Sequence, residues 1–176
     1  MGRITRFAYD RLSRLVAVVL PNPATGANPP LVDGNSPEAG ALVTRYAYDE
    51  QGNKISQTDA EGRITRWTFD GMGRQRSRVL PLGQQEQFEY DAGGQPSAHL
   101  TFNGERIETT HDSLGRIATL SLPGGHVRRF SYGASGQVSQ IDDHGAVYAF
   151  EYDVRDRLTR AVDPQGLHQR PQRGGV

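Results

Sequence analysis

Aspartate and histidine are the residues of this chain with the chemistry for acid–base catalysis or metal binding. The five histidines never stand at the i, i+4 spacing by which two imidazoles on one helix hold a zinc ion; they are His99, His111, His126, His144 and His168. The sequence also lacks a Gly-x-Ser-x-Gly nucleophile motif and a phosphate-binding glycine loop. We therefore predict no catalytic residue, no metal site and no cofactor, and hence no enzyme activity.

The aspartates recur in one local pattern, Asp-x-x-Gly, which indicates a turn rather than a general acid or base. An Asp carboxylate at the first position of a turn can accept hydrogen bonds from backbone N–H groups ahead of it, and a Gly three residues later can adopt the left-handed conformation. The adjacent pair Asp142-Asp143 also falls within such a turn. The pattern begins at Asp49, Asp70, Asp91 and Asp112, and a second set begins at Asp59, Asp142 and Asp163.

An aromatic-x-aromatic pair stands just before most turns of the first set and returns about every 21 residues, as at Tyr48, Phe69 and Tyr90. Only Phe102 and Tyr148 lie outside these pairs. Self-similarity at a fixed period of this size indicates a repeat architecture. The pairs are Phe7–Tyr9, Tyr46–Tyr48, Trp67–Phe69, Phe88–Tyr90, Phe130–Tyr132 and Phe150–Tyr152.

The segments between turns are short and have the period of β-strands. In residues 63–69, Thr65, Trp67 and Phe69 share one parity, so they face the same side of a strand, whereas on a helix they would diverge. No segment keeps a 3.6-residue period long enough for a helix. We predict an all-β fold in which each repeat is an antiparallel hairpin of two strands.

The composition is rich in turns and poor in core residues. The chain of 176 residues is 35% hydrophobic, with 21 Gly and 10 Pro, which suits strands with one apolar and one wet face. Open sheets of more than ~10 strands tend to curl, so we predict one continuous, curved sheet. The predicted divisions are a first partial repeat at 1–20, a Pro/Gly-rich inserted loop at 21–41, repeats at 42–167 and a disordered tail at 168–176.

The charge and apolar runs exclude some partners. The formal net charge is zero, which argues against a nucleic-acid partner, since that would need a clustered basic surface. The longest apolar run, Leu15–Leu20, is far too short to span a bilayer, and residues 1–6 show no secretory signal.

The aromatic pairs allow two interpretations. In the first, the rings pack as part of a sheet wall. In the second, exposed rings stack on sugar faces and form a carbohydrate-binding or adhesion module; a buried Trp67 would favour the wall and an exposed one the glycan site. The ligand-stacking residues of this alternative are Tyr46, Trp67, Phe88, Phe130 and Phe150.

The repeats resemble those of the Rhs (rearrangement hotspot) or YD-repeat family. The resemblance rests on Tyr48-Asp-Glu-Gln-Gly-Asn53, Phe69-Asp-Gly-Met-Gly-Arg74, His111-Asp-Ser-Leu-Gly-Arg-Ile117 and Tyr152-Asp-Val-Arg-Asp-Arg-Leu158. It covers almost the whole chain outside 21–41 and the tail. Ser13 and Asp156 replace the turn Gly, Gly133 replaces the Asp, and His111 replaces the Tyr.

In that family, such repeats wind into a hollow β-sheet shell that encloses a toxin domain, as in polymorphic toxins of interbacterial competition, or serve cell adhesion in animal teneurins. The resemblance implies a non-enzymatic structural role, with other shell repeats or a toxin cargo domain as partners, and a secreted or cell-surface bacterial protein. The sequence opens and closes in mid-repeat, which favours a partial repeat region of a larger shell. No toxin domain is visible in the chain.

Overall fold

The computed structural model describes residues 3–27, 42–166 and 168–169. These residues form fifteen β-strands and one short 3-10 turn, η1 (Pro123–Gly125). The strands are β1 (Arg6–Tyr9), β2 (Leu15–Leu20), β3 (Leu42–Tyr48), β4 (Lys54–Thr58), β5 (Ile64–Phe69), β6 (Gln75–Val79), β7 (Gln85–Tyr90), β8 (Pro96–Leu100), β9 (Arg106–His111), β10 (Ile117–Leu122), β11 (His126–Tyr132), β12 (Val138–Asp143), β13 (Ala146–Tyr152), β14 (Leu158–Val162) and β15 (His168–Gln169).

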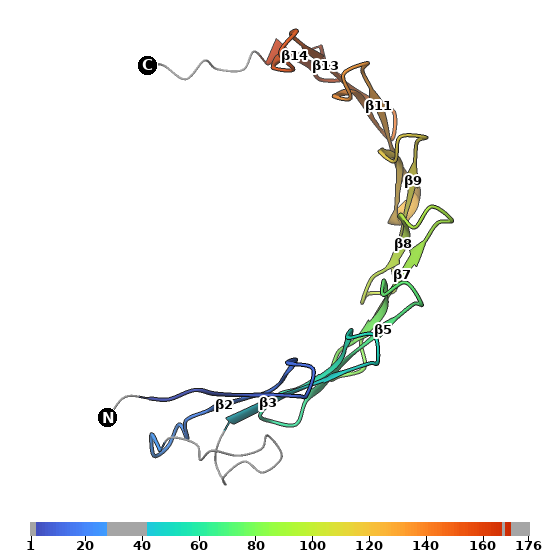
Figure 1. The fold of residues 1–176 in the computed structure, drawn as a ribbon. Helices are drawn as coiled ribbons and strands as arrows, with labels where there is room; N and C mark the ends of the chain where they lie inside the picture. The colour runs from blue at the N-terminus through green and yellow to red at the C-terminus, as the bar shows by residue number, and fades with distance from the viewer. Residues whose placement is uncertain (1–2, 28–41, 167, 170–176) are drawn as a thin grey trace, which may run out of the picture. The chain divides into compact units, whose positions relative to one another are not determined.

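The chain divides into two compact units, Met1–Gln87 and Phe88–Val176, and the boundary falls inside β7. Within each unit every strand pairs antiparallel with the strand before it and the strand after it in the chain (Figure 1). This order follows from the short turns, because two antiparallel strands can be joined by a tight hairpin. The predicted all-β class and the antiparallel hairpin repeats are confirmed.

The second aromatic of a pair lies where the strand register shifts. Ala47 pairs with Ser56 but Tyr48 pairs with Lys54, so Ile55 is an extra residue in β4. Equivalent shifts separate Ala8 from Tyr9, Thr68 from Phe69, Ser131 from Tyr132 and Glu151 from Tyr152. Each shift is a β-bulge, in which one strand has an extra residue opposite its partner.

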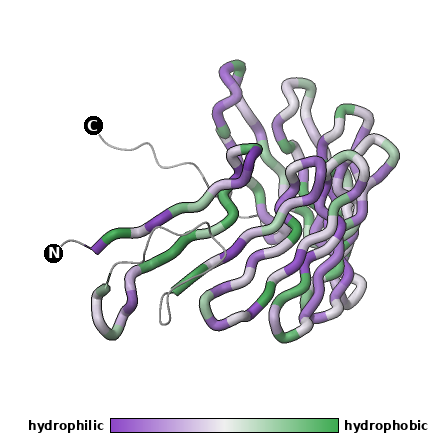
Figure 2. Tube along the Cα trace, turned by 60° about the horizontal axis from the view of Figure 1, so that its bottom comes forward, coloured by the Kyte–Doolittle hydropathy of each residue, from purple (hydrophilic) through white to green (hydrophobic). Residues whose placement is uncertain are grey.

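Few hydrophobic side chains are fully buried in the described residues. In the first unit Ala17, Val19 and Val43 form a small cluster with Ala8, and in the second unit Ala98 is buried. Hydrophobic and hydrophilic residues are interspersed along the chain (Figure 2). Half-buried and exposed side chains alternate along β1 and β9, as expected of a sheet with two different faces. Within the described residues, neither a helix beyond η1 nor a second sheet layer covers a unit.

One turn differs from the sequence prediction. Asp143 pairs with Ala146, so only His144 and Gly145 form the loop of the β12–β13 hairpin. Both have positive φ, 54° and 92°, which is the backbone of a two-residue type I′ loop. The Asp-x-x-Gly pattern at Asp142 therefore gives a tighter hairpin than the same pattern at Asp59.

The predicted insertion and tail are described only in part. Residues 22–27 form a turn in which the Asn22 side chain accepts hydrogen bonds from the N–H groups of Ala24 and Thr25, at 2.9 and 3.2 Å. Residues 28–41 and 170–176 lie outside the described residues, and His168–Gln169 form β15. None of the described segments is a helix that could cross a membrane.

Candidate functional site

The turn at Asp112 shows how an Asp-x-x-Gly sequence closes a hairpin. The Asp112 Oδ1 atom accepts hydrogen bonds from the N–H groups of Leu114 and Arg116, at 2.9 and 3.0 Å. Its Oδ2 atom accepts a hydrogen bond from Arg116 Nε at 2.8 Å. The backbone closes the same loop, because Gly115 N–H donates to the Asp112 carbonyl and Asp112 N–H donates to the Arg116 carbonyl. One carboxylate thus orders five residues.

The predicted capping by Asp is confirmed, and it recurs along the chain. The same arrangement is found at four other turns, where the Asp carboxylate accepts hydrogen bonds from backbone N–H groups of its turn and from the arginine four residues later. The Nε–Oδ2 distance is 2.7 Å at each of Asp10, Asp59, Asp70 and Asp153. At Asp49 the fourth residue is Asn53, whose Nδ2 donates at 2.9 Å. Sequence reasoning missed the role of this fourth residue, although the recurring Gly-Arg dipeptide was a usable signal.

These contacts lower the pKa of the turn carboxyls below the ordinary value of 3.8. For Asp59, Asp112 and Asp153, the hydrogen bond from the arginine side chain is the largest cause of the lowered pKa. For Asp10 and Asp70, the hydrogen bond from the backbone N–H of the arginine is the largest cause of the lowered pKa. Each carboxylate is therefore held ionised by groups of its own turn, which suits a structural cap and not a proton-transfer catalyst.

Two turns carry a strained residue in place of glycine. Ser13 and Asp156 occupy the closing position with φ of 60° and 56°, where Gly52 has a φ of 90°. A residue with a Cβ atom pays about 1–2 kcal/mol for the left-handed conformation. The substitutions identified in the sequence therefore keep the turn geometry at a cost in stability.

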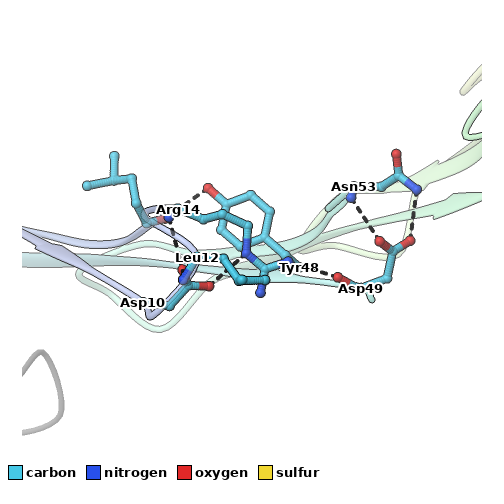
Figure 3. Close-up of polar contacts among 7 residues, drawn as sticks. Asp10, Leu12, Arg14, Tyr48, Asp49 and Asn53 are labelled. Carbon is cyan, nitrogen blue, oxygen red and sulfur yellow. Dashed lines mark hydrogen bonds and ion pairs between the residues drawn. The ribbon is translucent and has the colours of Figure 1, made fainter. Parts of the chain in front are cut away.

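Successive hairpins are joined by a contact between an arginine and a tyrosine, drawn in Figure 3. The Arg14 guanidinium carbon lies 4.9 Å from the centroid of the Tyr48 ring. The Tyr48 hydroxyl donates a hydrogen bond of 2.8 Å to the Leu15 carbonyl, and Arg14 Nη1 donates one of 3.0 Å to the Asp49 carbonyl. Arg14 thus binds the carboxylate of its own turn and the ring of the next repeat.

The second unit repeats this arrangement, which we call the Arg–Tyr contact. The Arg116 guanidinium carbon lies 4.2 Å from the Tyr132 ring centroid, and the Tyr132 hydroxyl donates to the Ile117 carbonyl at 2.8 Å. In both cases the acceptor is the residue directly after the arginine. Such cation–π contacts contribute about 0.5–1 kcal/mol at exposed sites, and the hydroxyl fixes the register between repeats.

The residues of the glycan alternative are half-buried, and several ring faces are already covered. Lys54 Nζ lies 5.5 Å from the Tyr46 ring centroid and 4.5 Å from that of Trp67. Phe88 is stacked on His99, with centroids 4.6 Å apart and planes 4° apart. Phe130 lies opposite Ile141 and Phe150 lies opposite Ala161. Trp67 is neither buried nor exposed, so its burial does not separate the two interpretations.

Several other carboxylates are held by ion pairs or hydrogen bonds. Asp143 binds Arg128 at 2.7 Å, and Asp142 accepts the N–H of Gly145 at 2.7 Å, so the two carboxylates of the adjacent pair have separate partners. Glu86, only 6% exposed, forms an ion pair with Arg78 Nε at 2.6 Å. The ring centroids of His126 and His144 lie 4.6 Å apart. Among the described residues, no group of three or more His, Asp or Glu is placed to hold a metal ion.

The fold and the recurring turns define a class: a β-repeat protein built from Asp-capped hairpins. Residues 31–169 match the family model of the Teneurin YD-shell, and the chain belongs to that family. The Rhs/YD-repeat resemblance seen in the sequence is thereby confirmed. No curated protein sequence matches the chain.

Solved structures share the fold at low identity. A crystal structure of TcdB2-TccC3-Cdc42 matches with a TM-score of 0.66 at 18% identity. A crystal structure of TcdB2-TccC3 without the hypervariable C-terminal region and a Tc holotoxin pore of Photorhabdus luminescens each match with 0.65 at 19% identity. Each match covers 91% of this chain and 9% of the other chain, so this chain spans a small part of those proteins.

Proposed function

We propose that this chain is a structural segment of a YD-type shell and that it encloses or supports a toxin domain carried by another part of the assembly. The observation that carries the proposal is that the described residues form a sheet without a second layer. Only four hydrophobic residues of the described chain are buried, and large apolar side chains such as Phe7 and Ile4 are 57% and 45% exposed. A sheet of this kind gains stability when another surface covers one of its faces.

The family and the fold support the same role. The chain belongs to the Teneurin YD-shell family, and one of the structures that share its fold is named as a Tc holotoxin pore. The Asp caps close single turns and the two Arg–Tyr contacts each join neighbouring hairpins, so both suit a wall with a small core. The partners that follow from this role are other shell repeats and a toxin cargo domain.

The contacts around the aromatic rings favour a wall over a glycan site. A sugar that stacked on Tyr46 or Trp67 would have to displace the Lys54 ammonium from the rings, and one that stacked on Phe88 would have to compete with His99. The five stacking residues stay a prediction of the alternative function. It is tested on a glycan array with the change in Trp67 fluorescence as a second readout.

The shell role is tested by isolating the tagged chain from its native cells and identifying its companions by mass spectrometry. We expect a YD-repeat polypeptide or a toxin domain among them, and we expect that companion to resist added protease. The variant Asp112→Ala, which loses the cap of one turn, should make the companion sensitive to protease. Ser113→Ala in the same turn is the matched control and should leave protection unchanged.

Isolation of the chain alone, or a companion that protease cuts equally with and without the chain, would contradict enclosure. Binding of a sugar together with a change in Trp67 fluorescence would instead support the carbohydrate-binding alternative.

A further inference from the structure

One contact between hairpins of the second unit differs from the Arg–Tyr contact at both of its positions. In the complete contact, Arg116 binds the carboxylate of its own turn and covers Tyr132, which ends β11. In the turn after β7, the residue four positions after Asp91 is Gln95, and the residue that ends β9 is His111. Gln95 and His111 therefore occupy the positions of the arginine and the tyrosine.

The change from arginine to glutamine leaves one oxygen of the Asp91 carboxylate for another ligand. Asp91 Oδ1 still accepts the Gln95 N–H at 2.9 Å, so this part of the cap is kept. The second oxygen, Oδ2, binds an arginine side chain in the Asp112 turn. In the Asp91 turn it lies 3.8 Å from His111 Nδ1, which is too far for a hydrogen bond.

Two polar atoms of this contact are buried without a hydrogen bond, and they are His111 Nδ1 and Gln95 Oε1. The His111 side chain is only 11% exposed. The Gln95 amide lies against the turn that follows β9, because a Cβ atom added at Gly115 would be 2.5 Å from Gln95 Nε2. A buried polar atom without a partner destabilises a fold, and in native proteins such atoms often bind a water molecule or an ion.

We propose that Asp91 Oδ2, Gln95 Oε1 and His111 Nδ1 bind one divalent transition-metal ion, such as Zn²⁺. Zinc lies about 2.0–2.1 Å from a histidine nitrogen and about 2.0–2.2 Å from a carboxylate oxygen. The separation of 3.8 Å between Oδ2 and Nδ1 is shorter than the sum of two such bonds, so one ion can bind both atoms at a bent angle. The amide oxygen is the third ligand, and a water molecule completes a four-coordinate site.

The ion joins the turn after β7 to the end of β9, as the Arg–Tyr contact joins other hairpins. An imidazole nitrogen is a ligand for transition metals, whereas calcium and magnesium take oxygen ligands. Histidine spacing along the chain could not reveal this site, because its ligands come from two different hairpins. The proposal goes beyond the shell role and is independent of it, since a wall segment needs no metal.

The test is a calorimetric titration of the purified, chelator-treated chain with Zn²⁺, beside its urea midpoint with and without the ion. An ion that binds only the folded protein raises the midpoint, so we expect Zn²⁺ to raise it and Ca²⁺ to leave it unchanged. His111→Ala and Asp91→Asn should each weaken Zn²⁺ binding about tenfold or more. His126→Ala is the matched control, because it removes the ring that lies beside His144 and should leave the binding unchanged.

The double variant Gln95→Arg/His111→Tyr restores the residues of the Arg–Tyr contact. It should keep its β-sheet by circular dichroism and show no response to Zn²⁺, so it serves if His111→Ala fails to fold. A wild-type chain that shows neither heat of binding nor a raised midpoint with Zn²⁺ would overturn the proposal, because water alone then fills this position. Binding that survives in the double variant, or that is lost in His126→Ala, would overturn it as well.

Discussion

At the scale of single residues, turn carboxylates supply stabilising contacts that in other folds come from a hydrophobic core. The Asp112 carboxylate accepts hydrogen bonds from two backbone N–H groups and from the side chain of Arg116. The surrounding sheet buries little apolar area. We expect Asp112→Ala to lower the free energy of unfolding, because three hydrogen bonds are lost at once. Urea denaturation followed by circular dichroism measures the change.

Two comparisons make that measurement specific. Asp112→Asn keeps an oxygen for the backbone N–H groups but loses the charge that binds Arg116, so its effect should be intermediate. Ser113→Ala alters the neighbouring residue and should be neutral. Equal midpoints for Asp112→Ala and the wild type would contradict the capping role.

The lowered pKa values of the turn carboxyls predict a loss of stability in acid. A carboxyl whose pKa is lower in the folded state contributes stability that is complete above its unfolded value and is lost as the pH falls through its folded value. The pKa of Asp10, Asp49, Asp59, Asp70, Asp112 and Asp153 is lowered from 3.8.

The urea midpoint of the protein should therefore be nearly constant from neutral pH to about 4 and fall steeply below it. Several carboxyls act together, so the fall should be shallower in a variant with Asp-to-Asn changes at Asp59, Asp70 and Asp112. A midpoint independent of pH throughout the acid range would show that the caps contribute nothing as anions.

The strained turn residue offers a change that stabilises the protein. Ser13→Gly places the residue best suited to a φ of 60° in the β1–β2 turn, and we expect it to raise the free energy of unfolding by about 1 kcal/mol. The reciprocal change Gly52→Ser, at a φ of 90° and with open space around the position, should lower it by a similar amount. The two urea curves should move in opposite directions; if Ser13→Gly destabilises, strain is not the cause.

At the scale of elements, the hairpins were predictable and the contacts between them were not. The parity of Thr65, Trp67 and Phe69 and the Asp-x-x-Gly pattern predicted strands and turns, because both are local in sequence. The Arg–Tyr contact joins Arg14 to Tyr48, and spacing alone does not show which turns become neighbours. The sequence also did not show which side chains contact the aromatic rings, which in the structure include Lys54 and His99.

The contact between hairpins is tested by removing one hydroxyl. Tyr48→Phe loses the hydrogen bond to the Leu15 carbonyl and should cost about 0.5–1.5 kcal/mol of unfolding free energy. The control is Tyr148→Phe, at a tyrosine outside the aromatic pairs. If both substitutions have the same effect, the hydroxyl of Tyr48 does not join the hairpins.

At the scale of the whole molecule, each hairpin pairs with its neighbours in chain order, so stability should be nearly a sum of local terms. A change in one hairpin should then leave distant hairpins intact. Asp112→Ala should shift the loss of far-UV circular dichroism while the fluorescence transition of Trp67, the only tryptophan, stays where it is. Coincident shifts of both signals would instead indicate a single cooperative unit.

The pairing of Leu20 with Leu42 and of Val19 with Val43 has a practical consequence. These pairs hold β2 and β3 in register although 21 residues separate the two strands in the sequence. The strand ends that this connection joins, Leu20 and Leu42, are the ends farther from the Asp10 and Asp49 turns, so an insertion between them would enter the chain away from those caps and from the Arg–Tyr contact. The same site should accept an epitope or a fluorescent label, so the protein could be followed in living cells with its sheet unaltered.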